Sequence, residues 1–151
     1  MPLNNFGTCG PHLRCAQPDA NGFDIMDDLG VVMVLKLNTN DEFPDAEETR
    51  LFSGRYTGKT IWSVPLNSFK PDEVQIRQLI RQIQGGPPLL IHCTHGRDRT
   101  GFVCAAYRII VEGWDFARAW DEMKQYGWTP FSSLTDHAIK EVLQKLGVPH
   151  A

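Results

Sequence analysis

The feature that most constrains the fold lies at residues 87–110, PPLLIHCTHGRDRTGFVCAAYRII. Here an apolar run, a polar and basic segment and a second apolar segment follow one another directly. Residues 88–92 form a continuous apolar run, which is typical of a strand buried on both faces. From Thr100 onward, apolar residues recur at helical spacing. The chain therefore places a polar and basic loop, which begins with Cys93, between a buried strand and a helix.

The rest of the chain alternates between strand and helix patterns in the same way. Further strands are predicted at residues 13–17, 31–37 and 59–65. Helices are predicted at residues 18–30, 71–86, 114–126 and 132–146, with a weakly helical, acid-rich segment at 41–52 that Pro44 breaks. This alternation predicts an α/β fold with a small central, mostly parallel sheet flanked by helices. Ligands bind beyond the carboxyl ends of the strands in such sheets, which is where Cys93 lies.

Length and composition limit the class of protein. A chain of 151 residues with 42% hydrophobic residues suits a single domain over residues 1–151. The net charge of −3 disfavours a nucleic-acid partner, so any anion chemistry must be confined to a local site. The sequence shows no signal peptide and no apolar run long enough to span a membrane, and we expect a cytoplasmic monomer. The four cysteines form no C-x-x-C pair, so neither a zinc ribbon nor a thioredoxin-like redox pair is encoded, and we expect no metal or other cofactor.

The loop after residue 92 combines groups that favour a reactive thiolate. Backbone amides and the positive end of a helix dipole attract an anion at the start of a helix. The same field favours the thiolate form of Cys93, and His92, Arg97 and Arg99 add to it. A cysteine in this position is a candidate nucleophile.

The residues after Cys93 suit the binding of a phosphoryl group. Arg99 carries a planar guanidinium that can hold two oxygens of one phosphoryl group. Gly96 allows a tight bend and a close approach of the backbone. Thr100 is expected to donate a hydrogen bond to the sulfur of Cys93. The sequence therefore predicts a phosphate-binding loop that contains its own nucleophile.

These residues carry a family resemblance. The segment HCTHGRDRTG at residues 92–101 fits the H-C-x5-R-[ST]-G signature of cysteine-dependent protein tyrosine and dual-specificity phosphatases. Four other segments are similar to the compact atypical dual-specificity phosphatases of bacteria, plants and fungi: NFG at 5–7, LRCAQP at 13–18, LGVVMVLKL at 29–37 and EGWDFARAWDEMKQYG at 112–127. The resemblance covers most of the chain, and residues 38–58 contribute least to it.

The resemblance implies a mechanism without a metal ion. Cys93 would attack phosphorus to form a cysteinyl-phosphate, which water would then hydrolyse. His92 would tune the cysteine through backbone contacts, and Thr100 would assist breakdown of the intermediate. The phosphate-binding residues implied by the resemblance are Thr94, His95, Gly96, Arg97, Asp98 and Arg99.

Two aspartates are candidates for the general acid that protonates the leaving group. Many relatives carry an aspartate on the loop after the preceding strand, where this chain has Asn67 and, further on, Asp72. Asp98 is the first candidate, because some related phosphatases use an aspartate directly before the signature arginine. Asp72 is the second candidate. Each has a structural alternative, since Asp72 suits the start of a helix and Asp98 could pair with Arg97 or Arg99.

Several alternatives stay open at this stage. The expected substrate is phosphotyrosine, with phosphoserine and phosphothreonine as further possibilities. A phosphoinositide, an inositol polyphosphate or pyrophosphate, or an RNA 5′-phosphate would suit the same loop, as would a phosphate-binding module without catalysis. A sulfurtransferase would not need the arginine, and a P-loop NTPase is excluded because the loop lacks the Walker lysine.

Four residues outside the loop have two interpretations each. Arg14 and Lys70 could bind a second phosphate or lie on the solvated surface. Trp62 and Trp128 could contact the substrate or pack in the core.

Overall fold

The computed structural model describes residues 3–67, 70–129 and 133–147. The strands are β1 (Gly7–Cys9), β2 (His12–Cys15), β3 (Met33–Lys36), β4 (Thr60–Ser63) and β5 (Leu89–His92). The helices are α1 (Ala20–Asp28), α2 (Asp45–Leu51), α3 (Glu73–Gln84), α4 (Arg99–Ile110), α5 (Phe116–Gln125) and α6 (Ser133–Leu146). Across these ranges, none of the helices combines the length and the hydropathy that crossing a bilayer requires.

The strands form one sheet in the order β1-β2-β5-β3-β4. Strand β1 is antiparallel to β2, whereas the pairs β2–β5, β5–β3 and β3–β4 are parallel. The predicted mostly parallel sheet is therefore confirmed. Because parallel strands end at the same edge, the loops that follow β2, β3, β4 and β5 meet there. The loop after β5, which carries Cys93, lies next to the loops after β2 and β3.

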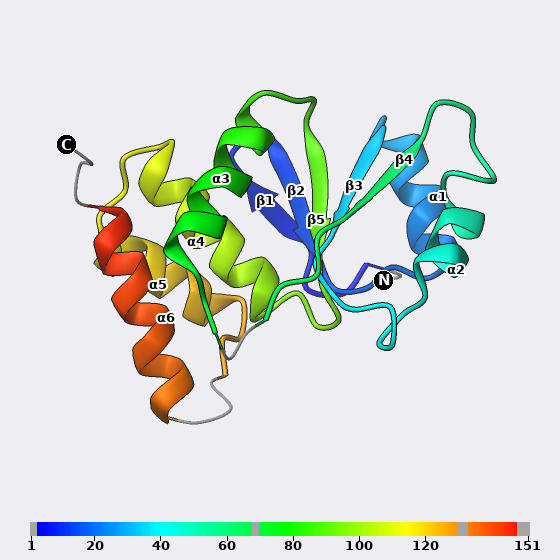
Figure 1. Cartoon of the computed structure of the whole chain (residues 1–151). Coiled ribbons are helices and arrows are strands. Elements are labelled where there is room, and N and C mark those ends of the chain that lie inside the picture. The colour runs from blue at the N-terminus through cyan, green and yellow to red at the C-terminus, as the bar shows by residue number, and fades with distance from the viewer. Residues whose placement is uncertain (1–2, 68–69, 130–132, 148–151) are drawn as a thin grey trace.

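Helices cover both faces of the sheet (Figure 1). Helices α3, α4, α5 and α6 lie on one face, and α1 and α2 lie on the other. Alternate residues of the central strands point into the two cores: Leu35 and Ile91 pack toward the larger layer, whereas Val34 and Leu90 pack toward α1 and α2. The continuous apolar runs in β3 and β5 follow from this burial on both faces.

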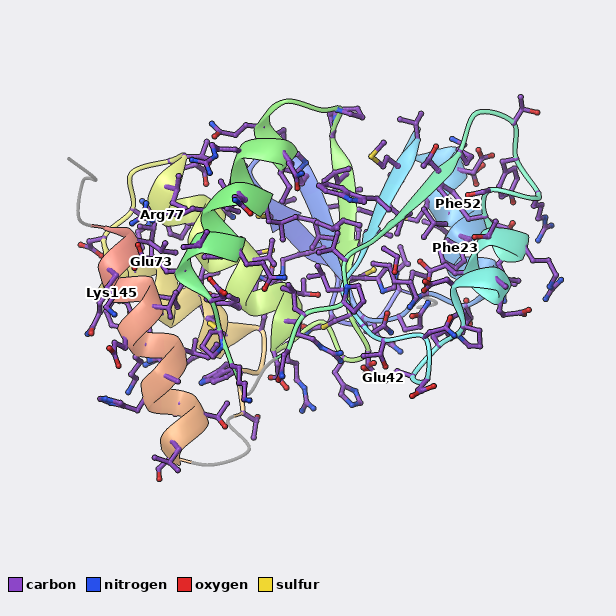
Figure 2. The ribbon with its side chains drawn as sticks, viewed as in Figure 1. Phe23, Glu42, Phe52, Glu73, Arg77 and Lys145 are labelled. Carbon is purple, nitrogen blue, oxygen red and sulfur yellow. The ribbon has the colours of Figure 1, made fainter. Side chains whose placement is uncertain are left out.

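The smaller core is built around two aromatic rings. Phe23 of α1 and Phe52, which follows α2, are fully buried with ring centroids 5.4 Å apart (Figure 2). Their packing fixes α2 against α1, and it places the residues before and within α2 close to the end of β3.

The structure corrects several predicted boundaries. Strand β2 begins at His12 and ends at Cys15, and α1 occupies only residues 20–28 of the predicted 18–30. Pro44 does not break a helix but precedes α2, because proline is well tolerated just before a helix begins. Strand β1 was not predicted, since three residues are too few to show an alternating pattern.

Candidate active site

The loop of residues 93–98, called the signature loop from here on, connects β5 to α4. Gly96 has a φ of +71°, which side chains rarely adopt. A Cβ at this position would lie 2.7 Å from the backbone nitrogen of Ala16. Only glycine allows the signature loop to bend this way and pack directly against the chain that leaves β2.

Donors from the N-terminal part of the chain bind the carbonyl oxygens of the signature loop. The side-chain amide of Asn5 donates to the carbonyls of His95 (3.3 Å) and Gly96 (3.2 Å), and Arg14 also donates to Gly96 (3.2 Å). Within the part of the chain that the structure describes, the amides of residues 94–98 donate to no backbone carbonyl. With the carbonyls held from outside, these amides are available to bind an anion.

Arg14 supports the signature loop from the protein interior. Its side chain is fully buried, and its guanidinium stacks on the ring of Tyr126, 3.6 Å from the ring centroid. The surface interpretation of Arg14 is therefore wrong, because the side chain points from β2 under Gly96 and not into solvent. Lys70, by contrast, is exposed.

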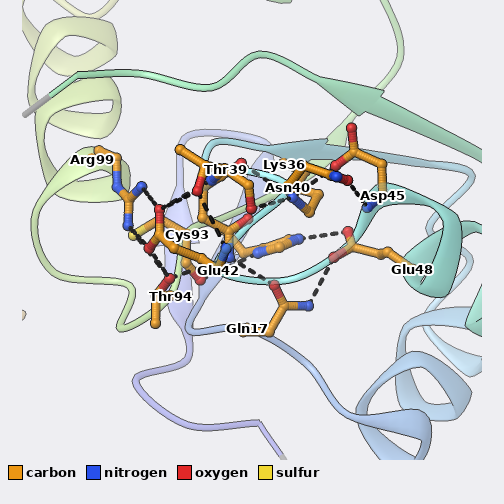
Figure 3. Close-up of polar contacts among 12 residues, drawn as sticks. Gln17, Lys36, Thr39, Asn40, Glu42, Asp45, Glu48, Cys93, Thr94 and Arg99 are labelled. Carbon is orange, nitrogen blue, oxygen red and sulfur yellow. Dashed lines mark hydrogen bonds and ion pairs between the residues drawn. The ribbon is translucent and has the colours of Figure 1, made fainter.

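Cys93 and Arg99 lie at the two ends of the signature loop. Cys93 directly follows β5 and is 2% exposed, and Arg99 is the first residue of α4. Hydrogen bonds to Glu42 are the main cause of a raised pKa for Arg99. The predicted proximity of the cysteine and the arginine is present in the structure (Figure 3).

Glu42 binds two residues that were predicted to hold phosphate. Its carboxylate accepts hydrogen bonds from Arg99 Nη1 (2.5 Å) and Nη2 (2.6 Å), and from the hydroxyl of Thr94 (2.5 Å; Figure 3). These contacts, Arg99 first, hold the pKa of Glu42 well below its usual range. No role for Glu42 could be predicted from the sequence, since it lies in an acid-rich segment that resembles a solvated helix.

A second carboxylate lies behind the signature loop. Glu48 of α2 and His92 at the end of β5 are both fully buried, and Oε2 of Glu48 lies 2.7 Å from Nε2 of His92. Gln17 donates to the other oxygen of Glu48 (2.8 Å), and it accepts a hydrogen bond from Asn38 (2.9 Å), which also donates to Thr94 Oγ1 (3.3 Å). A buried polar network thus connects the start of α2 to the signature loop (Figure 3).

Both candidates for the general acid line one small cavity beside Arg99. Asp72 and Asp98 share this cavity with Asn67 and Trp128. The side chain of Asp72 accepts a hydrogen bond from the backbone amide of Gln75 (3.1 Å), as expected for a residue that caps a helix. The structural interpretation of Asp72 is therefore confirmed, although the residue also lines the cavity.

Asp98 has different surroundings. It precedes α4 without forming a side-chain cap, and its Oδ1 is buried without a hydrogen-bond partner among the described residues. The alternative pairing with Arg97 or Arg99 is not formed within 4.0 Å in the described part of the chain. A buried carboxylate oxygen that has no partner is available to a group of the substrate.

Two further predictions for the loop region differ from the structure. Thr100 is buried, but its hydroxyl has no partner among the described residues, so the expected hydrogen bond to Cys93 is not formed. Trp128 is mostly buried and donates from Nε1 to Asp136 (3.0 Å), which holds its ring at the wall of the cavity. Trp62 lies on β4, in a different groove.

Comparisons with known proteins agree with this geometry. The family model described as "Tyrosine phosphatase family" matches residues 12–112, which contain the whole signature loop. A curated relative, the dual specificity protein phosphatase TpbA of Pseudomonas aeruginosa, is 30% identical over 139 residues, or 89% of this chain. The chain spans 60% of the length of that relative.

Solved structures extend the comparison. The crystal structure of P. aeruginosa TpbA is 26% identical, with a TM-score of 0.75 over 95% of this chain and 91% of the other. A variant of TpbA in complex with pTyr has a TM-score of 0.74 at 25% identity, over 95% of this chain and 90% of the other. The catalytic domain of the PP-IP phosphatase Siw14 of S. cerevisiae shares the fold, with a TM-score of 0.76 and 21% identity over 93% and 86% of the two chains. With the family model covering more than half of its residues, the chain belongs to the tyrosine phosphatase family.

Proposed function

We propose that this protein is a metal-independent phosphatase that hydrolyses phosphotyrosine monoesters, and also phosphoserine and phosphothreonine monoesters, through a cysteinyl-phosphate. The observation that carries the proposal is the signature loop, where Cys93, unbonded amides and Arg99 surround one site at the start of α4. The curated relative TpbA is named a dual specificity protein phosphatase, and a structure of it contains pTyr.

The first chemical step uses the two ends of the signature loop. The sulfur of Cys93 attacks phosphorus, and the bond between phosphorus and the leaving oxygen breaks as the new sulfur–phosphorus bond forms. The amides of residues 94–98 and the guanidinium of Arg99 bind the phosphoryl oxygens and their growing negative charge. The leaving oxygen takes a proton from Asp98, a residue that lines the cavity beside Arg99.

The second step returns the enzyme to its starting state. Asp98, now ionised, accepts a proton from a water molecule whose oxygen attacks phosphorus. The sulfur–phosphorus bond breaks, Cys93 leaves as a thiolate, and inorganic phosphate is released. Entry of the phosphoryl group requires Glu42 to give up contacts with Arg99 and Thr94, because these are the groups that the substrate must use.

A panel of substrates tests the proposal. Phosphotyrosine peptides should be hydrolysed fastest, compared with phosphoserine peptides, a phosphoinositide, an inositol polyphosphate and an RNA 5′-triphosphate. The Cys93→Ser variant should lose turnover while it still binds vanadate, and Cys104→Ser, a change to another buried cysteine, should keep turnover. If only a non-protein substrate is hydrolysed, the protein is a phosphatase of that substrate class and not a protein phosphatase. Normal turnover by Cys93→Ser would refute the mechanism.

Three further statements stay predictions from the sequence. They are the cytoplasmic location, the monomeric state and the single domain over residues 1–151. The negative net charge disfavours nucleic acid as the partner, and we expect a phosphorylated protein or a small phosphorylated molecule.

A further inference from the structure

The pair of Glu48 and His92 contains two ionisable groups with no exposure to solvent. Glu48 extends from α2, and His92 is the residue directly before Cys93 (Figure 3). Buried ionisable groups that contact each other share protons in a way that the surrounding hydrogen bonds determine. The location of those protons affects the charge next to the nucleophile.

The neighbours of the pair determine where its protons lie. Nδ1 of His92 is 3.3 Å from the carbonyl oxygen of Cys93, which can only accept, so Nδ1 carries a proton. Gln17 donates to Oε1 of Glu48, and its own oxygen accepts from Asn38, which fixes the orientation of the Gln17 amide. Glu48 therefore faces a donor on one oxygen, as a carboxylate requires. A carboxyl group is ordinarily a stronger acid than an imidazolium, so we assign the proton between Glu48 and His92 to Nε2.

We propose that Glu48 is a positioning residue that holds His92 as an imidazolium beside Cys93 and thereby favours the thiolate form of Cys93. The ring of His92 lies between the carboxylate of Glu48 and the backbone carbonyl of Cys93, so the positive charge of the pair is on the side of Cys93. The inference deepens the proposed function and rests on it, because it assumes that Cys93 is the nucleophile.

Other charged or titratable groups around His92 do not replace this role. In the sheet, His92 pairs with Cys15 of β2 and with Lys36 of β3. Burial is the main cause of a raised pKa for Cys15, which keeps that thiol neutral. The ammonium of Lys36 is 2.8 Å from Asp45, so its charge is balanced. Arg14, on β2, points under Gly96.

The Glu48→Gln variant removes the charge of the pair and keeps its shape. The new amide can accept from Gln17 and donate to Nε2 of His92, so His92 becomes neutral while Nδ1 still donates to Cys93. We expect the midpoint of the pH dependence of the alkylation rate of Cys93 by iodoacetamide to rise by about one unit. Below that midpoint, alkylation should then be roughly tenfold slower than in the original protein. The matched control is Glu47→Gln, since Glu47 is the neighbouring residue on α2, is partly exposed and binds Arg50.

Nuclear magnetic resonance of ¹⁵N-labelled histidine gives an independent readout of the same pair. Both ring nitrogens of His92 should carry protons in the original protein near pH 7, and only Nδ1 should do so in Glu48→Gln. An unchanged alkylation midpoint, or a neutral His92 in the original protein, would overturn the proposal. Neither measurement depends on turnover, so a protein with the expected shift but no phosphatase activity would refute only the proposed function.

Discussion

Glu42 and Glu48 lie on one segment of the chain, yet they contact the region of the signature loop in different surroundings. Glu42 is reached by solvent and binds Arg99 and Thr94, two of the residues expected to hold phosphate. Glu48 is fully buried and binds His92 next to the nucleophile. A carboxylate in contact with water can leave its partner at little cost, whereas removal of a buried carboxylate leaves an unpaired charge in the interior. The contacts of Glu42 can therefore be replaced by contacts with substrate, whereas the contact between Glu48 and His92 is expected to stay formed.

The largest expected effect comes from removal of the guanidinium of Arg99, which binds Glu42 here and would bind the phosphoryl group of the substrate. Arg99→Ala should lower kcat/KM for a phosphotyrosine peptide by about 10³-fold or more, because an arginine that stabilises a transferring phosphoryl group contributes on that order. Steady-state kinetics measure the loss. Arg97→Ala, a change in the same loop, is the control, and an equal loss in both variants would contradict a special role for Arg99.

The next effect concerns the two acids beside Arg99. Asp98→Asn should slow the hydrolysis of a substrate with a poor leaving group by about 10²-fold or more, and should slow a substrate with a good leaving group much less. Asp72→Asn should mainly change stability, because Asp72 caps α3. Rates for both variants on both substrates check this ranking, which fails if Asp72→Asn alone shows dependence on the leaving group.

A smaller effect is expected for substitution of Glu42, the solvent-accessible carboxylate of the two. Glu42→Gln should tighten the inhibition by inorganic phosphate by about five-fold, since it removes about 1 kcal/mol of repulsion between charges a few ångströms apart in a watery site. Inhibition constants measured at fixed ionic strength check the change, with Asp41→Asn, a substitution of the neighbouring exposed acid, as the control. Weaker phosphate binding would instead make Glu42 a support for Arg99.

The smallest effect concerns stability in acid. The pKa of Glu42 is lowered in the folded protein by Arg99 and Thr94, so its contribution to stability is present above the unfolded value of about 4.3 and is lost as the pH falls below it. Thermal unfolding of Glu42→Gln should therefore change less between pH 5 and pH 3 than that of the original protein. A steeper dependence in the variant would contradict the assignment of the Glu42 contacts.

Much of the fold and one side of the site could be predicted from the sequence. The apolar runs of β3 and β5 and the helical spacing of α3 and α4 are local patterns, and the nucleophile and arginine belong to one short motif. Their proximity follows from a loop at the start of a helix, which needs no knowledge of distant contacts.

The other side of the site could not be predicted, because it depends on contacts between distant residues. Glu42 and Glu48 lie in an acid-rich stretch whose composition is typical of a solvated helix. Only the packing of α2 beside the end of β3 brings them to Thr94 and His92, which are 52 and 44 positions away in the chain. The burial of Arg14 could not be predicted for the same reason, since a local pattern does not show that its side chain points under Gly96.

The hydrogen bonds of Asn5 have a consequence for the limits of the catalytic unit. One amide group of Asn5 donates to the carbonyls of His95, Gly96 and Tyr126, which come from two distant parts of the chain. Asn5 also precedes residues 12–112, the range that identifies the family. A version of the protein trimmed to that range would keep Cys93 and Arg99. It would lose the side chain of Asn5, whose hydrogen bonds connect the signature loop to the backbone at Tyr126.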